Sequence, residues 1–207
     1  KKLQSKFVPS PLPVLNVGGT LVSDPKQVAD ALESHFSNVF SATHYSADFQ
    51  LIRNRTVVVP PSNTASQSYN LNFSMDELQH ALSLSSQTSP GEDEIHYSMI
   101  SHLLNNSKEF FLDSLNMFWG SKSSPKPWKT SIIVPVLKPG KDSSLPQSYR
   151  PIAMTSCVSK VYERMINNRL VWFLESKNLI TNRQFGFRKN RCTLDPLLMI
   201  TREIQSA

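Results

Sequence analysis

The stretch WKTSIIVPVLKPGKDSSLPQSYRPIAMTSC, residues 128–157, contains two short apolar runs on either side of a polar segment. The runs 131–137 and 150–154 are rich in β-branched residues, and residues 138–149 join them. Runs of this kind around a Pro/Gly-containing connection predict an antiparallel β-hairpin. Three basic residues lie on or beside its tip: Lys138, Lys141 and Arg150.

Helical patterns surround this hairpin. Residues 156–177 keep apolar side chains at the 3.6-residue period of an amphipathic helix, and Ser74 with Glu77 has the spacing of a capping box. The other expected helices cover 25–39, 74–85, 97–119 and the residues after Thr193. A second, short hairpin is expected around Gly18-Gly19, within a tether over residues 1–20, and a long loop or linker is expected over 41–72. These elements predict an α+β fold that is rich in helix.

Charge is unevenly distributed along the chain. Residues 1–119 contain 7 Lys and Arg against 11 Asp and Glu, whereas residues 120–207 contain 15 against 5, a net charge of +10. A basic block of this size suits a phosphate polymer, although a solvated basic surface with no ligand has the same composition.

Several classes of protein are not supported by the sequence. No apolar run approaches the roughly 18 residues that a membrane helix needs. The Gly140-Lys141 pair lacks the preceding glycine of a Walker phosphate loop, and no G-x-S-x-G motif is present. Cys157 and Cys192 are 35 residues apart with no partner at zinc spacing, so we expect free, buried thiols in a reducing compartment.

A second basic cluster follows the long helix. Arg183, Arg188, Lys189 and Arg191 alternate with Phe185 and Phe187 over residues 183–191. Arginine can fork onto phosphate oxygens and aromatic rings can stack on bases. The alternative is that the two rings are core residues that hold the loop in place.

These segments resemble a known family in their order along the chain. The hairpin, the helix VSKVYERMINNRLVWFLE (158–175) and QFGFRKNRCT (184–193) are similar to the finger region of the reverse transcriptases of non-long-terminal-repeat (LINE-type) retrotransposons, most of all the jockey-like branch. SPGEDEIHYSMI (89–100) resembles the N-terminal extension motif of that family, and residues 17–40 resemble its linker between endonuclease and polymerase. Glu94, Asn190 and Cys192 depart from the family pattern, where Gly, Gly and Ser are common.

The resemblance implies a division of the chain. Residues 1–72 would be a linker with one helix, 73–127 the N-terminal extension helices, and 128–207 the fingers and the start of the palm of a right-hand polymerase. The palm would be incomplete, because the catalytic aspartates of the family would lie beyond residue 207. We therefore expect no catalytic and no metal-binding residue here, and no polymerisation by this chain alone.

The resemblance also implies roles for individual residues. Lys138, Lys141 and Arg150 would bind the incoming nucleotide, with Tyr149, Pro151 and Ile152 setting the strand that aims Arg150. The template-binding residues would be Gly186, Phe187, Arg188, Lys189 and Arg191. The alternative for Arg150 is an ion pair with a carboxylate at the base of the hairpin.

The expected partners are an RNA template, a DNA primer, deoxynucleoside triphosphates and the remainder of the same polypeptide, meaning palm, thumb and an endonuclease. Mg²⁺ would be held by the palm, and the protein would act in nucleus and cytoplasm, neither secreted nor membrane-bound. Two other hypotheses stay open: a non-catalytic basic RNA-binding module, such as a degenerate retroelement remnant, and a purely structural interaction domain.

Overall fold

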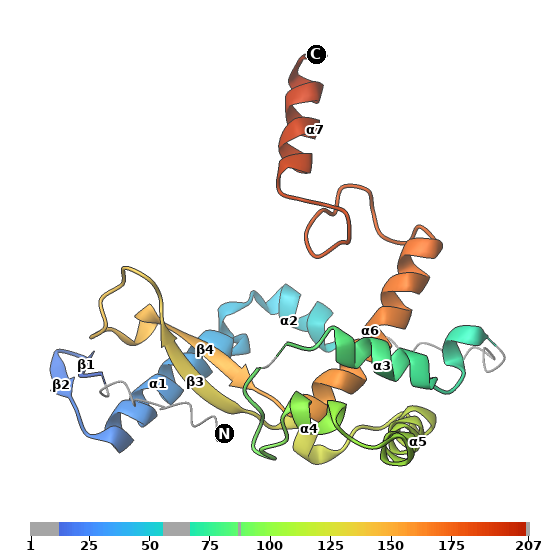
Figure 1. The fold of residues 1–207 in the computed structure, drawn as a ribbon. Helices are drawn as coiled ribbons and strands as arrows, with labels where there is room; N and C mark the ends of the chain where they lie inside the picture. The colour runs from blue at the N-terminus through green and yellow to red at the C-terminus, as the bar shows by residue number, and fades with distance from the viewer. Residues whose placement is uncertain (1–12, 56–66, 87, 206–207) are drawn as a thin grey trace. The chain divides into compact units, whose positions relative to one another are not determined.

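The computed structural model describes residues 13–55, 67–86 and 88–205 (Figure 1). The chain divides into two compact units. The hairpin unit comprises Lys1–Ser62, Ser89–Ile95 and Pro125–Ser156, and the helical unit comprises Asn63–Thr88, His96–Ser124 and Cys157–Ala207. Within the hairpin unit, residues 13–40 pack with the strands of 132–154. The division at 72/73 and 127/128 that the resemblance implies stays a prediction.

The predicted basic hairpin is present. Strands β3 (Ile132–Leu137) and β4 (Tyr149–Met154) are antiparallel, with Ile132 opposite Met154 and Leu137 opposite Tyr149. The short 3₁₀ turns η3 (Lys126–Lys129) and η4 (Pro146–Ser148) precede the two strands.

The N-terminal part of the hairpin unit forms a small core with these strands. Strands β1 (Leu15–Val17) and β2 (Thr20–Val22) are joined by Gly18-Gly19, whose positive φ angles of 59° and 89° suit the tight turn. Helix α1 (Pro25–Phe40) begins where Asp24 accepts a hydrogen bond from the Gln27 N–H. Its buried residues Val28, Leu32 and Phe36 cluster with Leu15 and with Tyr149 of β4.

The prediction of irregular chain over 41–72 is wrong in part. This segment contains η1 (Ala42–His44), helix α2 (Ala47–Asn54) and η2 (Ser68–Asn70). Residues 56–66, and residues 1–12 of the predicted tether, lie outside the described residues. The Ser46 hydroxyl caps α2 by accepting from the Phe49 N–H. Helix α2 buries no residue and has only 8 residues, fewer than the roughly 11–18 over which an apolar period is recognised in a sequence.

The helical unit is built around α6 (Cys157–Ser176), which matches the predicted helix of 156–177. Helix α3 (Met75–Ser83) packs on α6 and on α5 (Asn105–Ser121), and α4 (Tyr97–Ser101) packs on α6. The capping box of α3 is confirmed, because Ser74 and Glu77 exchange both hydrogen bonds. Phe73 joins the elements, with ring centroids 5.0 Å from Trp119 and 6.1 Å from Tyr162.

The single helix expected over 97–119 is instead two helices. The chain leaves the helix at His102, and Leu104 adopts extended backbone angles before α5 begins at Asn105. Leu103 and Leu104 maintain the apolar period through the break and so conceal it, although Leu104 is 78% exposed.

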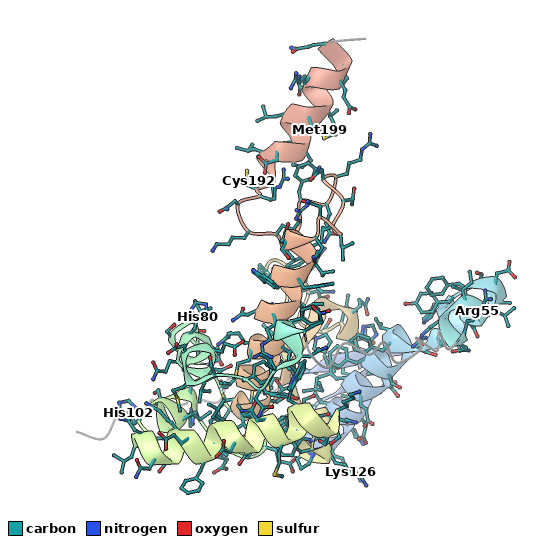
Figure 2. All side chains as sticks on the ribbon, turned by 90° about the vertical axis from the view of Figure 1, so that its right-hand side faces the viewer. Arg55, His80, His102, Lys126, Cys192 and Met199 are labelled. Atoms are coloured by element: carbon teal, nitrogen blue, oxygen red, sulfur yellow. The ribbon has the colours of Figure 1, made fainter. Side chains whose placement is uncertain are left out.

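Helix α7 (Leu194–Gln205) is amphipathic but buries no residue within the described chain. Figure 2 shows side chains standing out along this helix, where Met199 is labelled. Both cysteines are free, as expected; Cys157 is buried, but Cys192 is exposed, which corrects the prediction that it is buried. Within residues 13–55, 67–86 and 88–205, no helix is both long and apolar enough to cross a membrane.

Candidate functional site

The β3/β4 hairpin has two different faces. Side chains alternate along a strand, and the register places Tyr149 and Leu137 on one face and Arg150 and Val136 on the other. Tyr149 is 8% exposed, in contact with the core around α1, whereas Arg150 is exposed. Burial of one face therefore directs Arg150 outward.

Arg150 is surrounded by apolar surface and not by acids. Val136 lies opposite it and Ile152 follows on the same face, and both are about half exposed at 46% and 47%. Among the described residues the Arg150 side chain has no hydrogen bond or ion pair, so the ion pair considered as its alternative role is not found there.

The hairpin tip, residues 138–148, is closed by Lys138. Its backbone N–H donates to the Ser148 carbonyl (2.8 Å), and its Nζ donates to the Gln147 carbonyl (2.7 Å). Lys141 is exposed at the turn that Gly140 makes with a φ of +70°. Asp142 accepts a hydrogen bond from the Ser144 N–H, which holds the pKa of that carboxyl below its ordinary value. The tip therefore presents Lys141 with one neighbouring negative charge.

The loop after α6, residues 177–193, is held by Arg188. The guanidinium donates to both carboxylate oxygens of Glu175 (2.9 and 2.6 Å) and to the carbonyls of Thr181 and Gln184. The hydrogen bonds from Arg188 lower the pKa of Glu175, and those to Glu175 raise the pKa of Arg188. The Arg188 side chain is only 10% exposed, so its predicted phosphate contact stays a prediction that this arrangement does not test.

The other predicted residues of this loop are accessible. Gly186, Phe187, Lys189 and Arg191 are exposed, and Arg191 lies over the half-buried Phe185 ring at 5.6 Å from its centroid. Phe187 is fully exposed and has a φ of +58°, which is unusual for a bulky residue. The alternative that both rings are core residues is wrong for Phe187.

Two arginines of α6 hold the helical unit together and were not singled out from the sequence. Arg169 donates to both oxygens of Glu77 (2.6 and 2.8 Å), to three carbonyls of residues 69–72, and lies 4.1 Å from the centroid of the Phe73 ring. Arg164 donates to the Ala81 carbonyl and to the Ser85 hydroxyl. Partial burial alone would raise the pKa of Glu77, but the bonds from Arg169 and from the Ser74 N–H outweigh it and lower that pKa.

Comparison with known proteins identifies part of the chain. Residues 136–207 match the family model described as reverse transcriptase (RNA-dependent DNA polymerase). These residues are part of a reverse transcriptase domain. All eight residues predicted to bind nucleotide or template, from Lys138 to Arg191, lie inside the matched part of this domain.

Three curated relatives are proteins of mobile elements of Drosophila melanogaster. The chain is 26% identical over 197 residues to the probable RNA-directed DNA polymerase from transposon BS. The aligned region covers 95% of the chain and 22% of that relative. It is 33% identical over 123 residues to the corresponding protein of transposon X-element (59% and 14% covered) and 32% identical over 108 residues to that of mobile element jockey (52% and 12%). The chain is thus a distant homologue of non-long-terminal-repeat polymerases, as the resemblance indicated, and spans less than a quarter of their length.

Reverse transcriptases use Mg²⁺, and the described residues do not fit such a site. No group of three or more His, Cys, Asp or Glu side chains converges within the described residues. In the acidic turn 92–94, Asp93 accepts hydrogen bonds from the Ser156 hydroxyl (2.5 Å) and the Ile95 N–H. A Cβ on Gly91 would lie 2.6 Å from the Ser156 nitrogen, so this turn docks closely on the backbone between β4 and α6. The turn is therefore a packing element of the hairpin unit.

Proposed function

We propose that the chain supplies the fingers of an RNA-directed DNA polymerase of a non-long-terminal-repeat retroelement. The β3/β4 hairpin would grip the incoming nucleotide, and the loop 184–191 would border the template. One observation carries the proposal: Arg150 is exposed on apolar surface, without a partner among the described residues, in the part of the chain that matches reverse transcriptases.

The chemistry of the hairpin suits a nucleoside triphosphate. Lys141 supplies a point charge for phosphate oxygens, and the guanidinium of Arg150 can fork onto a phosphate or lie flat against a base. The exposed side chains of Val136 and Ile152 offer apolar contact to the base beside it. Lys138 would add charge, although its Nζ already donates to the Gln147 carbonyl.

The loop 184–191 suits single-stranded nucleic acid. Lys189 and Arg191 would contact the template backbone, Gly186 leaves room for close approach, and the exposed Phe187 ring can stack on a base. Arg188 would have to share its guanidinium with Glu175 in order to reach a phosphate. The proposed partners are therefore an RNA template, a DNA primer, deoxynucleoside triphosphates and the remainder of a longer polypeptide.

The test is a titration of ¹⁵N-labelled chain 1–207 with dTTP, followed by NMR. We expect amide shifts at Lys141 and Arg150, and about tenfold weaker binding for Arg150→Ala, the typical loss for a hydrogen-bonded charged contact. Arg55→Ala is the matched control, because Arg55 is an exposed arginine of the same unit outside the hairpin. Equal affinity in the two variants contradicts the assignment of Arg150.

The same labelled chain distinguishes the proposed function from the non-catalytic alternative. A basic RNA-binding module would bind a single-stranded RNA oligonucleotide but would give no dTTP-specific shifts at the hairpin. Absence of both interactions at low salt would favour a purely structural domain and overturn the proposal.

A further inference from the structure

Residues 15–40, which resemble an inter-domain linker, are packed onto the basic hairpin. Leu15 of β1 and Val28, Leu32 and Phe36 of α1 share one buried cluster with Tyr149, the first residue of β4. Each is at most 8% exposed. Figure 1 shows α1 crossing the β3/β4 hairpin within this unit. A linker that merely spanned two domains would not need such a cluster.

Two hydrogen bonds extend this contact to the tip. The Asn16 N–H of β1 donates to the Ser144 carbonyl (2.7 Å), and the Tyr149 hydroxyl donates to the Ser143 carbonyl (2.8 Å). Burial, followed by the nearby charge of Asp142, raises the pKa of Tyr149, so its hydroxyl remains a donor at neutral pH. The tip is thus held from outside the hairpin and from the buried face of β4.

The contact is concentrated at the tip end of the hairpin. A groove of about 990 Å³ lies between α1 and the strands and borders this contact, with Phe40, Pro135 and Tyr149 among its lining residues. Tyr149 is the residue of β4 that is buried in the cluster with α1. A two-stranded hairpin alone is marginally stable in water, so the segment that covers Tyr149 determines how firmly the tip is held.

We propose that residues 15–40 act as a brace for the nucleotide-binding hairpin and that Tyr149 is a positioning residue for Arg150 and the tip. Tyr149 and Arg150 are adjacent and point to opposite faces, so anchoring one ring fixes the direction of the other side chain. The role in nucleotide binding rests on the proposed function, whereas the mechanical role does not.

The test uses chain 1–207 with two brace variants and one control. Tyr149→Phe keeps the ring and removes only the bond to the Ser143 carbonyl, and Phe36→Ala removes a buried ring of α1. Val39→Ala is the control, because Val39 lies on the same helix with 57% of its surface exposed. Heteronuclear ¹⁵N relaxation of residues 140–148 measures the order of the tip, and dTTP titration measures its affinity.

We expect both brace variants to loosen the tip, and Tyr149→Phe to weaken dTTP binding about threefold, the order expected for one neutral hydrogen bond. The control should leave both readouts unchanged. A merely structural role would lower the melting temperature but leave tip order and affinity of the folded chain as they are, and that result overturns the brace. If Phe36→Ala does not fold, Tyr149→Phe alone decides. If the unaltered chain binds no dTTP, the proposed function fails, and the relaxation data still decide whether the brace exists.

Discussion

The arginines of the two units are used differently. In the hairpin unit Arg150 is exposed and has no partner among the described residues, whereas in the helical unit Arg164, Arg169 and Arg188 each donate to carbonyls or carboxylates of the chain itself. Both kinds count equally in the charge of +10 over residues 120–207. The composition therefore overstates the positive charge that is available to a phosphate ligand. The available positive charge lies on the hairpin and on a few loop residues.

The largest effect is expected from Arg169→Ala. Removal of this guanidinium leaves the Glu77 carboxylate and three carbonyls of residues 69–72 without their donor, which should lower the free energy of unfolding by about 3 kcal/mol. Urea unfolding measures it. Arg183→Ala, an exposed arginine of the same unit, should change it by less than about 0.5 kcal/mol. Similar losses in both variants would mean that Arg169 is not the structural arginine described here.

The next largest effect is a pH-dependent loss of stability in Glu77→Gln. Because the pKa of Glu77 is lowered in the folded chain, its ionised form contributes stability that is fully present above its ordinary value of 4.5 and is lost as pH falls through the folded pKa. At pH 7 the variant should be about 1 kcal/mol less stable, the low end for a charged hydrogen bond that is partly exposed. The difference should shrink steadily below pH 4.5 in urea titrations. A difference that stays constant down to pH 3 would show that the pair with Arg169 is not what stabilises the charged form.

The smallest expected effect is on the salt dependence of binding, which distinguishes exposed cations from ion-paired ones. Lys189→Ala should reduce the slope of log affinity for a single-stranded RNA oligonucleotide against log salt by about 0.7, the contribution of one phosphate contact in single strands. Arg188→Ala should leave that slope unchanged, because the charge of Arg188 already faces Glu175. If both variants changed the slope equally, the contrast between exposed and ion-paired cations would not hold.

Local signals explain what could be predicted from the sequence. The hairpin, the capping box of Ser74 and Glu77 and the span of α6 depend on neighbours within one element, and the structure has them within a residue or two of the expected positions. Helix α2 was missed because its 8 residues are too few to display an apolar period. The break at Leu104 was missed because apolar residues continue through it.

Partners of charged side chains could not be predicted in the same way. Arg169 and Glu77 are 92 residues apart, and nothing in the local sequence of α6 distinguishes Arg169 from an arginine that faces solvent. Arg188 likewise reads as one more cation of a basic loop, until its fork on Glu175 is seen. The packing of α1 on Tyr149 depends on a contact across more than a hundred residues, which no periodicity reports.

Arginine footprinting tests the central claim most directly. Chain 1–207 is treated briefly with phenylglyoxal, with and without dTTP, and the modified arginines are located by mass spectrometry. We expect Arg150 to react rapidly and to be protected by dTTP, whereas Arg164, Arg169 and Arg188 should react slowly in both conditions. Rapid modification of Arg169 and Arg188, or an Arg150 that reacts equally with and without dTTP, would contradict it.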